Sequence, residues 1–257
     1  MSKNQLIKAF ADVSAQDAQE FEMALLVGTL IDPDMDLQAV RENFERFIVS
    51  ISEPKIDGVG QLLKRYKQFG FGETPHSAVD LTHSSLDWVL RQKQGIPIAL
   101  SILLVEGARR LGLTACGINF PGHFLARIEG VLVDPMNMRV IEAGDLDVAN
   151  APMMLIEATT VMVGLRMLNN IKTMYMQAEN WHQVLEIIDY QFAIDNNSPE
   201  VMASLHFERG ECWQKLGVLS AAREEFTICA AICPYPELTT LAEEKARGLE
   251  VKNESLH

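Results

Sequence analysis

Apolar residues recur at helical spacing through the amino-terminal part of the chain. Residues 15–31 and 59–69 each carry an apolar stripe, and a third stripe begins after Asp36. That third stripe consists of Leu37, Val40, Phe44, Phe47, Ile48 and Ile51. Because an aspartate side chain can accept hydrogen bonds from the first-turn amides of a helix, we expect Asp36 to cap this segment. The spacing predicts three amphipathic helices.

A nearly continuous apolar run then follows Gly95. Pro97 has the fixed backbone angle that suits the first residue of a helix, and Gly112 stands where a helix commonly ends. The segment 98–111 between them is apolar almost all round until Glu106. A helix of that kind is buried in a globular protein, so we expect this one at the centre of its domain.

Short β-like runs follow the central helix, at residues 115–120, 123–128 and 131–134. Glu129-Gly130 lies between the last two runs and is a hairpin signal. A hairpin there would pair Ile128 with Val131, and the same register would set Leu125 opposite Asp134. The sequence therefore predicts a small antiparallel sheet.

This register places two titratable residues near each other. His123 lies two residues from Leu125 and would share its face with Asp134 as a diagonal neighbour, about 7–8 Å apart at the backbone. An imidazole and a carboxylate can meet across that separation. The pattern thus predicts a His123–Asp134 pair on the sheet.

From about residue 169 the pattern changes to helices alone, at 170–177, 181–194, 199–216 and 220–232. Two helix pairs resemble each other at an offset of 38, which matches Tyr175, Trp181, Val184 and Ile188 to Trp213, Leu219, Ala222 and Phe226. A tetratricopeptide unit is about 34 residues, so we interpret this segment as such repeats with a longer loop. The predicted domains are residues 1–160 and residues 161–257, the second ending in a frayed tail after Leu249.

Composition narrows the class of protein. The chain has 257 residues, of which 48% are hydrophobic and 22% charged, which is typical of a folded globular protein. Its net charge of −13 makes nucleic acid and an anionic membrane poor partners. No signal peptide is evident, and the longest apolar run is too short to span a bilayer, so we expect a cytoplasmic protein.

Cysteine and histidine spacing indicates no further chemistry. Cys116, Cys212, Cys229 and Cys233 form neither a disulfide framework nor a CxxC pair. No His, Cys or carboxylate set shows the spacing of a metal site. The sequence therefore predicts no metal and no cofactor.

The motifs described so far resemble the bacterial SirB-type family, whose members are described as a transglutaminase-like domain followed by tetratricopeptide repeats. The resemblance rests on SSLDWVLRQKQGIPIALSILLVEGARRLGL and on INFPGHFLARIEGVLVDPMN. It implies an α+β fold with a helical amino-terminal region and a transglutaminase- or cysteine-protease-like core that contains a small antiparallel sheet. Tetratricopeptide-like helical repeats would complete the chain.

The same resemblance implies a triad of nucleophile, base and orienter. In active relatives of the wider superfamily, a Cys stands near the N-terminus of the central helix, where the helix dipole and a His lower its pKa. That position falls here within Ile96, Pro97 and Ile98, none of which has a nucleophilic atom. His123 and Asp134 match the base and the orienter. The resemblance therefore implies a triad scaffold without its first member.

We therefore expect a catalytically silent scaffold that binds a protein or peptide. Its candidate site residues are the residual dyad His123 and Asp134, the cleft-lining Gly95, Ile96, Pro97 and Gly122, and the protein-binding aromatics Tyr175, Trp181 and Trp213. The alternative is a hydrolase or acyltransferase in which Cys116, a serine or an activated water is the nucleophile and His123 the base.

Overall fold

A computed structural model describes residues 1–73, 79–142, 155–195 and 198–254. The chain divides into two compact units, one formed by Met1 and residues 15–167, the other by residues 2–14 and 168–257. This division differs from the predicted domains at residues 2–14, which group with the C-terminal helices, and at residues 161–167, which group with unit 1. As functional domains, 1–160 and 161–257 stay a prediction.

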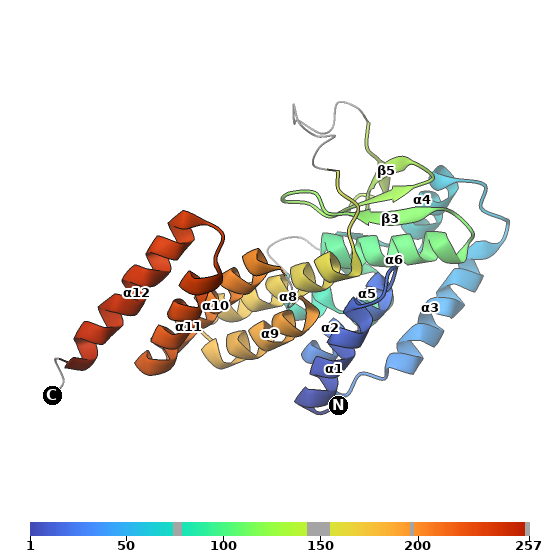
Figure 1. Cartoon of the computed structure of the whole chain (residues 1–257). Helices are drawn as coiled ribbons and strands as arrows, with labels where there is room; N and C mark the ends of the chain where they lie inside the picture. The colour runs from blue at the N-terminus through green and yellow to red at the C-terminus, as the bar shows by residue number, and fades with distance from the viewer. Residues whose placement is uncertain (74–78, 143–154, 196–197, 255–257) are drawn as a thin grey trace. The chain divides into compact units, whose positions relative to one another are not determined.

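Helices make up the first part of unit 1 (Figure 1). They are α2 (Glu20–Ile31), α3 (Leu37–Ser52), α4 (Val59–Gln68) and, after a 3-10 turn at Leu81–Ser84, α5 (Leu86–Gln92). The carboxylate of Asp36 accepts hydrogen bonds from the amides of Gln38 and Ala39 at 2.9 and 3.1 Å. The predicted cap of α3 is confirmed, and five of the six residues of its predicted stripe are buried, whereas Leu37 is half-buried.

Helix α6 (Pro97–Arg110) is the buried centre of unit 1. Pro97 is its first residue, and Gly112 follows its end with φ +82°, a conformation that glycine adopts without strain. Ten of its fourteen residues are buried. The central helix predicted from the sequence is therefore confirmed.

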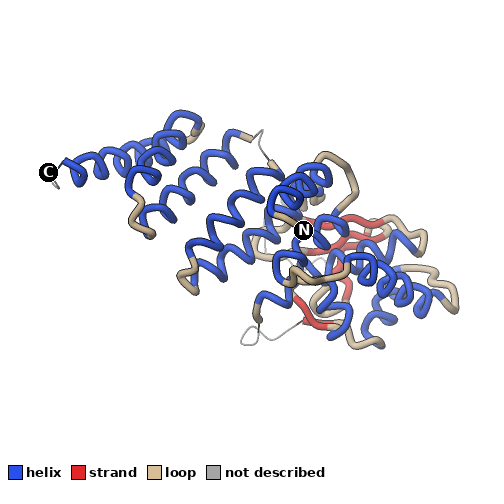
Figure 2. Tube along the Cα trace, turned by 90° about the horizontal axis from the view of Figure 1, so that it is seen from below, coloured by secondary structure: helices blue, strands red, loops and turns tan. Residues whose placement is uncertain are grey.

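A four-stranded antiparallel sheet lies along α6, in the order β3 (Ala115–Ile118), β4 (Leu125–Ile128), β5 (Val131–Asp134) and β6 (Arg139–Val140) (Figures 1 and 2). Ile128 pairs with Val131, as the hairpin signal predicts. Two strands are shorter than predicted: β3 ends at Ile118 instead of residue 120, and β4 begins at Leu125 instead of residue 123. A separate parallel pair joins β1 (Gly72–Glu73) to β2 (Gln94–Gly95) just before α6.

Two hydroxyls tie α6 to its surroundings. The Tyr66 hydroxyl on α4 donates to the Leu103 carbonyl at 2.8 Å, and it lies so close to α6 that a Cβ on Gly107 would be 2.1 Å from its oxygen. The Ser101 hydroxyl donates to the carbonyl of Leu125 on β4 at 2.9 Å. Ser101 therefore bonds the sheet and not a carbonyl of its own helix.

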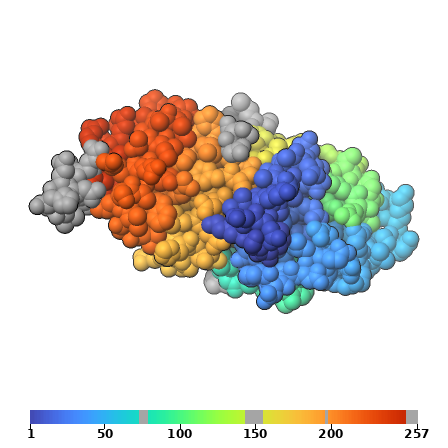
Figure 3. All heavy atoms as spheres, turned by 60° about the horizontal axis from the view of Figure 1, so that its bottom comes forward, coloured from blue at the N-terminus to red at the C-terminus, as the bar shows by residue number. Residues whose placement is uncertain are grey.

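Unit 2 is helical in its described residues. It contains α1 (Lys3–Ser14), the end of α8 (Thr160–Gln177), α9 (Trp181–Ile194), α10 (Pro199–Lys215), α11 (Leu219–Ile232) and α12 (Pro236–Glu254). The dark blue surface of α1 lies beside the orange surface of α9 in Figure 3. Beneath that surface, the buried rings of Phe10 on α1 and Tyr190 on α9 have their centres 5.3 Å apart. Helix α12 continues five residues beyond Leu249, where the sequence predicts a frayed tail.

The predicted 38-residue offset extends to backbone detail. Helix α11 begins and ends 38 residues after α9. In the turn before each helix, the amide of Asn180 donates to the Tyr175 carbonyl and the amide of Val218 to the Trp213 carbonyl, both at 2.9 Å. These two bonds are again 38 residues apart. Two equivalent helix–turn–helix units are therefore present in the fold.

No described helix has the length and apolar character needed to cross a membrane.

Candidate functional site

The first turn of α6 is the place where a superfamily nucleophile would stand. Ile96 occupies the N-cap position with no side-chain cap bond, Pro97 follows it, and Ile98 is almost fully buried. The backbone amide of Ile96 donates to the carbonyl of His83 at 3.2 Å. The turn is therefore apolar in its side chains, and its contact with His83 is made through the backbone carbonyl of that residue.

Gly95 is needed for the close packing before this turn. A Cβ at Gly95 would lie 2.6 Å from a methyl of Val89 and 3.3 Å from the His83 carbonyl. The His83 side chain is itself buried, with Nδ1 3.0 Å from an Asp80 carboxylate oxygen and its ring 4.3 Å from that of Trp88. The sequence contains no spacing signal for these contacts.

His123 lies in a tight turn rather than on a strand. Its amide donates to the carbonyl of Phe120 at 3.1 Å, and Gly122 between them has φ +76°. Pro121 followed by a glycine of positive φ is typical of a type II turn. The His123 side chain is exposed at the end of this turn.

The turn is held by a neighbouring cation. The Arg166 guanidinium donates to the Asn119 side-chain oxygen at 2.5 Å and to the Phe120 carbonyl at 3.1 Å. Its carbon also lies 5.5 Å from the centre of the Phe124 ring. Burial lowers the pKa of Arg166. Arg166 and Asn119 therefore fix the backbone that presents His123, a role that local sequence patterns did not indicate.

Asp134 is engaged by its own hairpin. Its carboxylate accepts hydrogen bonds from the Met136 amide at 2.9 Å, the Asn137 amide at 3.3 Å and the Asn137 side chain at 2.8 Å. Arg139 is paired with Asp134 across β5 and β6, and its Nε lies 3.5 Å from Oδ2 of Asp134. No hydrogen bond joins Asp134 to His123 in the described structure. The structure thus confirms the register and does not bring the two side chains into a bonded pair.

Cys116 is a poorly activated thiol. It is half-buried on β3, and burial raises its pKa, with the Glu157 carboxylate raising it further. Arg127 and Arg109 act in the opposite direction without reversing the shift. Since the thiolate is the nucleophile, a raised pKa reduces the reactive fraction at neutral pH.

The candidate serines are occupied or buried. Ser101 donates to β4, as described above, and Ser84 is buried. Ser85 occupies the N-cap position of α5, but its hydroxyl makes no cap bond and lies 3.9 Å from the sulfur of Met35. None of these hydroxyls is hydrogen-bonded to His123 in the described residues.

The three predicted aromatic residues come together in unit 2. Tyr175, Trp181 and Trp213 are all half-buried and pack on one cluster, whose buried members are Val184, Leu185, Ile188, Leu205 and Cys212. The Lys215 ammonium lies 5.7 Å from the centre of the Trp181 ring. Each aromatic residue therefore has a packing role, and each keeps part of its surface exposed.

Trp213 also lines a cleft of about 550 Å³ within unit 2. Charged residues from α1, α9, α10 and α11 surround it, and ion pairs link several of them: Lys3–Asp189 at 2.7 Å, Arg209–Glu225 at 2.8 Å and Arg209–Asp189 at 3.5 Å. Burial tends to raise the pKa of Glu225, but hydrogen bonds from His206 and Arg209 outweigh it and leave that pKa below its usual value. The cleft is thus a mixed, highly charged surface with one aromatic wall.

Comparison with known proteins is consistent with this architecture. A family model of the transglutaminase-like superfamily matches residues 34–172. A UPF0162 protein of Xylella fastidiosa is 25% identical over 98% of this chain and 96% of its own length. Protein SirB1 of Salmonella typhimurium is 22% identical over 98% of this chain and 100% of its own. F-box only protein 21 of the mouse is 29% identical over 37% of this chain and 16% of its own.

No solved structure matches the chain. The family model covers more than half of the sequence, including α6, the whole sheet and both residues of the predicted dyad. The chain belongs to the transglutaminase-like superfamily, in its SirB-type family.

Proposed function

We propose that this protein is a non-catalytic member of its superfamily that binds a protein or peptide partner. The observation that carries the proposal is the first turn of α6, where Ile96, Pro97 and Ile98 offer no nucleophilic atom. An acyl-transfer mechanism of the triad type needs such an atom beside a base. The His123 and Asp134 side chains, if they retain any function, would then serve recognition.

The alternative nucleophiles gain no support from their surroundings. The raised pKa of Cys116 disfavours its thiolate, and Ser101 already donates its hydroxyl proton to a backbone carbonyl. A metal-activated water would need ligands. Among the described residues, no group of three or more His, Cys, Asp or Glu side chains is placed to hold a metal ion.

The helical unit supplies the binding surface in this proposal. Its two units of offset 38 support the interpretation as tetratricopeptide-like repeats, which commonly bind partners on a concave face. The cleft beside Trp213 combines an indole with charges of both signs. Aromatic residues with partial exposure are frequent anchors in protein interfaces, and a ring of charges provides orientation.

Two measurements test the two halves of the proposal. The first is incorporation of a fluorescent primary amine into a glutamine-rich protein, together with hydrolysis of simple amide and ester substrates. We expect no turnover above the level of a His123→Ala variant. Turnover that this substitution abolishes would contradict the non-catalytic half.

The second measurement places a photo-crosslinking amino acid at His182, which is exposed and lines the cleft. The matched control carries it at Glu224, exposed on α11 and outside the cleft lining. We expect a protein adduct of defined mass from position 182, lost on Trp213→Ala, and none from position 224. Equal labelling from both positions would contradict a partner in this cleft.

A further inference from the structure

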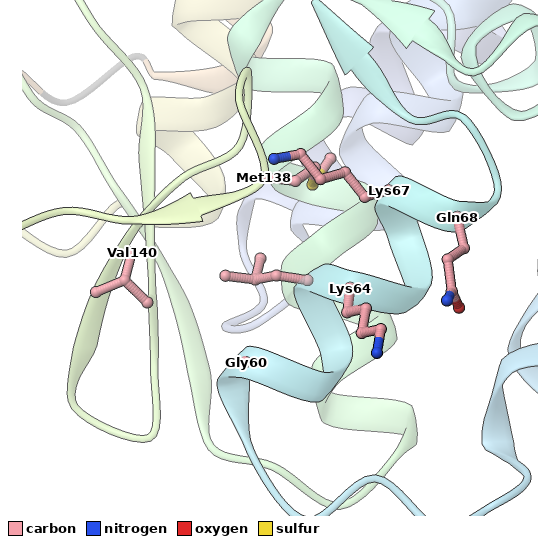
Figure 4. Close-up of a pocket in the computed structure, with 7 residues that line it drawn as sticks. Gly60, Lys64, Lys67, Gln68, Met138 and Val140 are labelled. Atoms are coloured by element: carbon pink, nitrogen blue, oxygen red, sulfur yellow. The ribbon is translucent and has the colours of Figure 1, made fainter.

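A second groove lies in unit 1, between helix α4 and strand β6. It has a volume of about 600 Å³ and is lined by Gly60, Leu63, Lys64, Lys67, Gln68, Met138 and Val140. Figure 4 shows Gly60, Lys64 and Lys67 on α4, Val140 on the strand opposite, and the Met138 side chain beside that of Lys67. The groove therefore runs between a helix and an edge strand.

The base of the groove is apolar. Leu63 and Met138 are 4% and 3% exposed, so they form the buried floor. Val140 on the edge strand is 39% exposed and provides an apolar wall that solvent reaches. A Cβ added at Gly60 would meet no atom within 4 Å, so the helix side of the groove is also open. An apolar side chain of a partner would find both a floor and space here.

The helix side of the groove is strongly basic in an acidic protein. Residues 55–68 contain three lysines, one arginine and a single carboxylate, that of Asp57, whereas the whole chain carries −13. Lys55, Lys64 and Lys67 are exposed and form no ion pair in the described structure. An adjoining hollow contains Lys55 and shares Lys64 and Gln68 with the groove. The positive charge is therefore concentrated at this surface, and no described carboxylate forms an ion pair with these three lysines.

The hairpin between β5 and β6, which begins at Asp134, forms the side of the groove opposite α4. The Asp134 carboxylate binds the Met136 and Asn137 amides, and the chain then turns through Met138 at φ +47° into β6. Asp134 thereby sets the position of Met138 and Val140. The residue that matches the superfamily orienter is thus part of the structure that forms this groove.

We infer that this groove is a docking site for an acidic peptide segment of a partner protein, with an apolar side chain inserted between α4 and β6. Charge complementarity specifies the partner: carboxylates beside Lys64, Lys67 and Lys55, and an apolar anchor over Leu63 and Met138. Helix α4 is about 15 Å long, which a helical or extended peptide of about 5–10 residues would cover. The groove is in the other unit from the cleft beside Trp213, so this inference stands independently of the proposed function.

An apolar floor distinguishes a peptide from a phosphate chain. Nucleic acid would also bind exposed lysines, but its sugar-phosphate backbone gains little from contact with the apolar Leu63, Met138 and Val140. The net charge of −13 also opposes its approach. A peptide uses both parts of the surface. Dependence of binding on Val140 therefore separates the two ligands.

The test uses the full-length protein and a fluorescein-labelled peptide of about 12 residues, built of glutamate with leucine at every third or fourth position. Fluorescence anisotropy measures its binding. A peptide of the same composition, with the leucines spread around the helix, tests the apolar anchor, and a single-stranded oligonucleotide of similar charge tests non-specific anion binding. We expect the striped peptide to bind at least tenfold more tightly than either.

The variants are Lys64→Glu with Lys67→Glu, and separately Val140→Asp. The matched control, Lys8→Glu with Arg247→Glu, changes the net charge equally at two exposed positions of unit 2. Thermal unfolding verifies that each variant is folded, and Val140 and both lysines are exposed enough to change without loss of the core. We expect both groove variants to weaken binding of the striped peptide at least tenfold, and the control and Trp213→Ala to leave it within twofold.

Three results would overturn the inference: no binding of the striped peptide, an equal loss in the control variant, or equal affinity for the scrambled peptide. Tighter binding of the oligonucleotide that depends on the lysines and not on Val140 would also overturn it, in favour of a phosphate-binding surface.

Discussion

Replacing Asp134 separates a structural role from the orienting role that the superfamily pattern implies. In the structure this carboxylate accepts three hydrogen bonds from its own turn, from the amides of Met136 and Asn137 and from the Asn137 side chain. Asp134→Ala removes all three. Asp134→Asn removes the charge but keeps an oxygen that can accept from the turn amides.

The size of the effect follows from these contacts. The Asp134 side chain is 14% exposed, so its loss leaves turn amides only partly accessible to water. Loss of an aspartate that accepts from consecutive amides costs about 0.5–2 kcal/mol, by analogy with helix caps. Arg139 is 49% exposed, so its ion pair contributes little. We expect Asp134→Ala to lower the free energy of unfolding by about 1.5 kcal/mol and Asp134→Asn by about 0.5 kcal/mol.

Urea denaturation followed by circular dichroism measures both changes, and a loss of about 1.5 kcal/mol corresponds to a Tm decrease of about 3–6 °C for a domain of this size. The imidazole signals of His123 in carbon–proton correlation spectra report on any pairing. If Asp134 acts on its hairpin alone, those signals should keep their chemical shifts in Asp134→Asn.

Two outcomes would refute this reasoning. One is an Asp134→Ala protein as stable as the original, because the hydrogen bonds of the hairpin would then contribute nothing. The other is a displacement of the His123 signals in Asp134→Asn without loss of stability, which would show that the carboxylate meets the imidazole in solution.

Three further predictions concern other parts of the chain. Gly107→Ala should lower the free energy of unfolding by about 2–3 kcal/mol in urea denaturation, because its new methyl group would displace the buried hydroxyl of Tyr66; an unchanged midpoint would contradict that packing. Cys116 should react with iodoacetamide at pH 7 more slowly than a free cysteine peptide, with its rate rising only at alkaline pH because its pKa is raised; rapid selective labelling would revive the enzyme hypothesis. The pKa of Glu225 is lowered in the folded state, so its contribution to stability is present above the usual carboxyl pKa near 4.5 and is lost as the pH falls below it. Glu225→Gln, with His206 still present, should therefore flatten the acid-side decline of the urea midpoint between pH 7 and pH 3. An unaltered slope would count against the ion-pair assignment.

Local signals in the sequence were sufficient for much of the fold. Glu129-Gly130 predicted the hairpin because Gly130 adopts positive φ without strain, and the two residues have φ +49° and +77°. The helix at 181–194 was predicted to the residue, since its apolar spacing and its N-cap Asn180 are adjacent in the chain. The start of β4 was misplaced although a local signal existed: Pro121-Gly122 predicts a type II turn, which ends before the strand can begin.

Contacts between distant segments could not be inferred in this way. The bond from Ser101 to β4 joins residues 24 apart, and helix α1 packs on α9 more than 170 residues away. The basic groove depends on α4 meeting β6, a two-residue strand that periodicity cannot detect. One part of it was readable in advance, because residues 55–68 are a net-positive segment in a chain of charge −13.

The candidate dyad shows where register arguments stop. Register fixes which backbone positions face each other, and it did so correctly for Ile128 and Val131. It does not determine which partner a side chain selects. Asp134 has three hydrogen-bond donors within three residues of itself, so bonding to them orders very little additional chain. Bonding to His123 would instead require β4 to begin earlier in the chain, where the Pro121-Gly122 turn lies. A carboxylate at the end of a strand is therefore better assigned first to its own turn, and to a distant base only after its local donors have been counted.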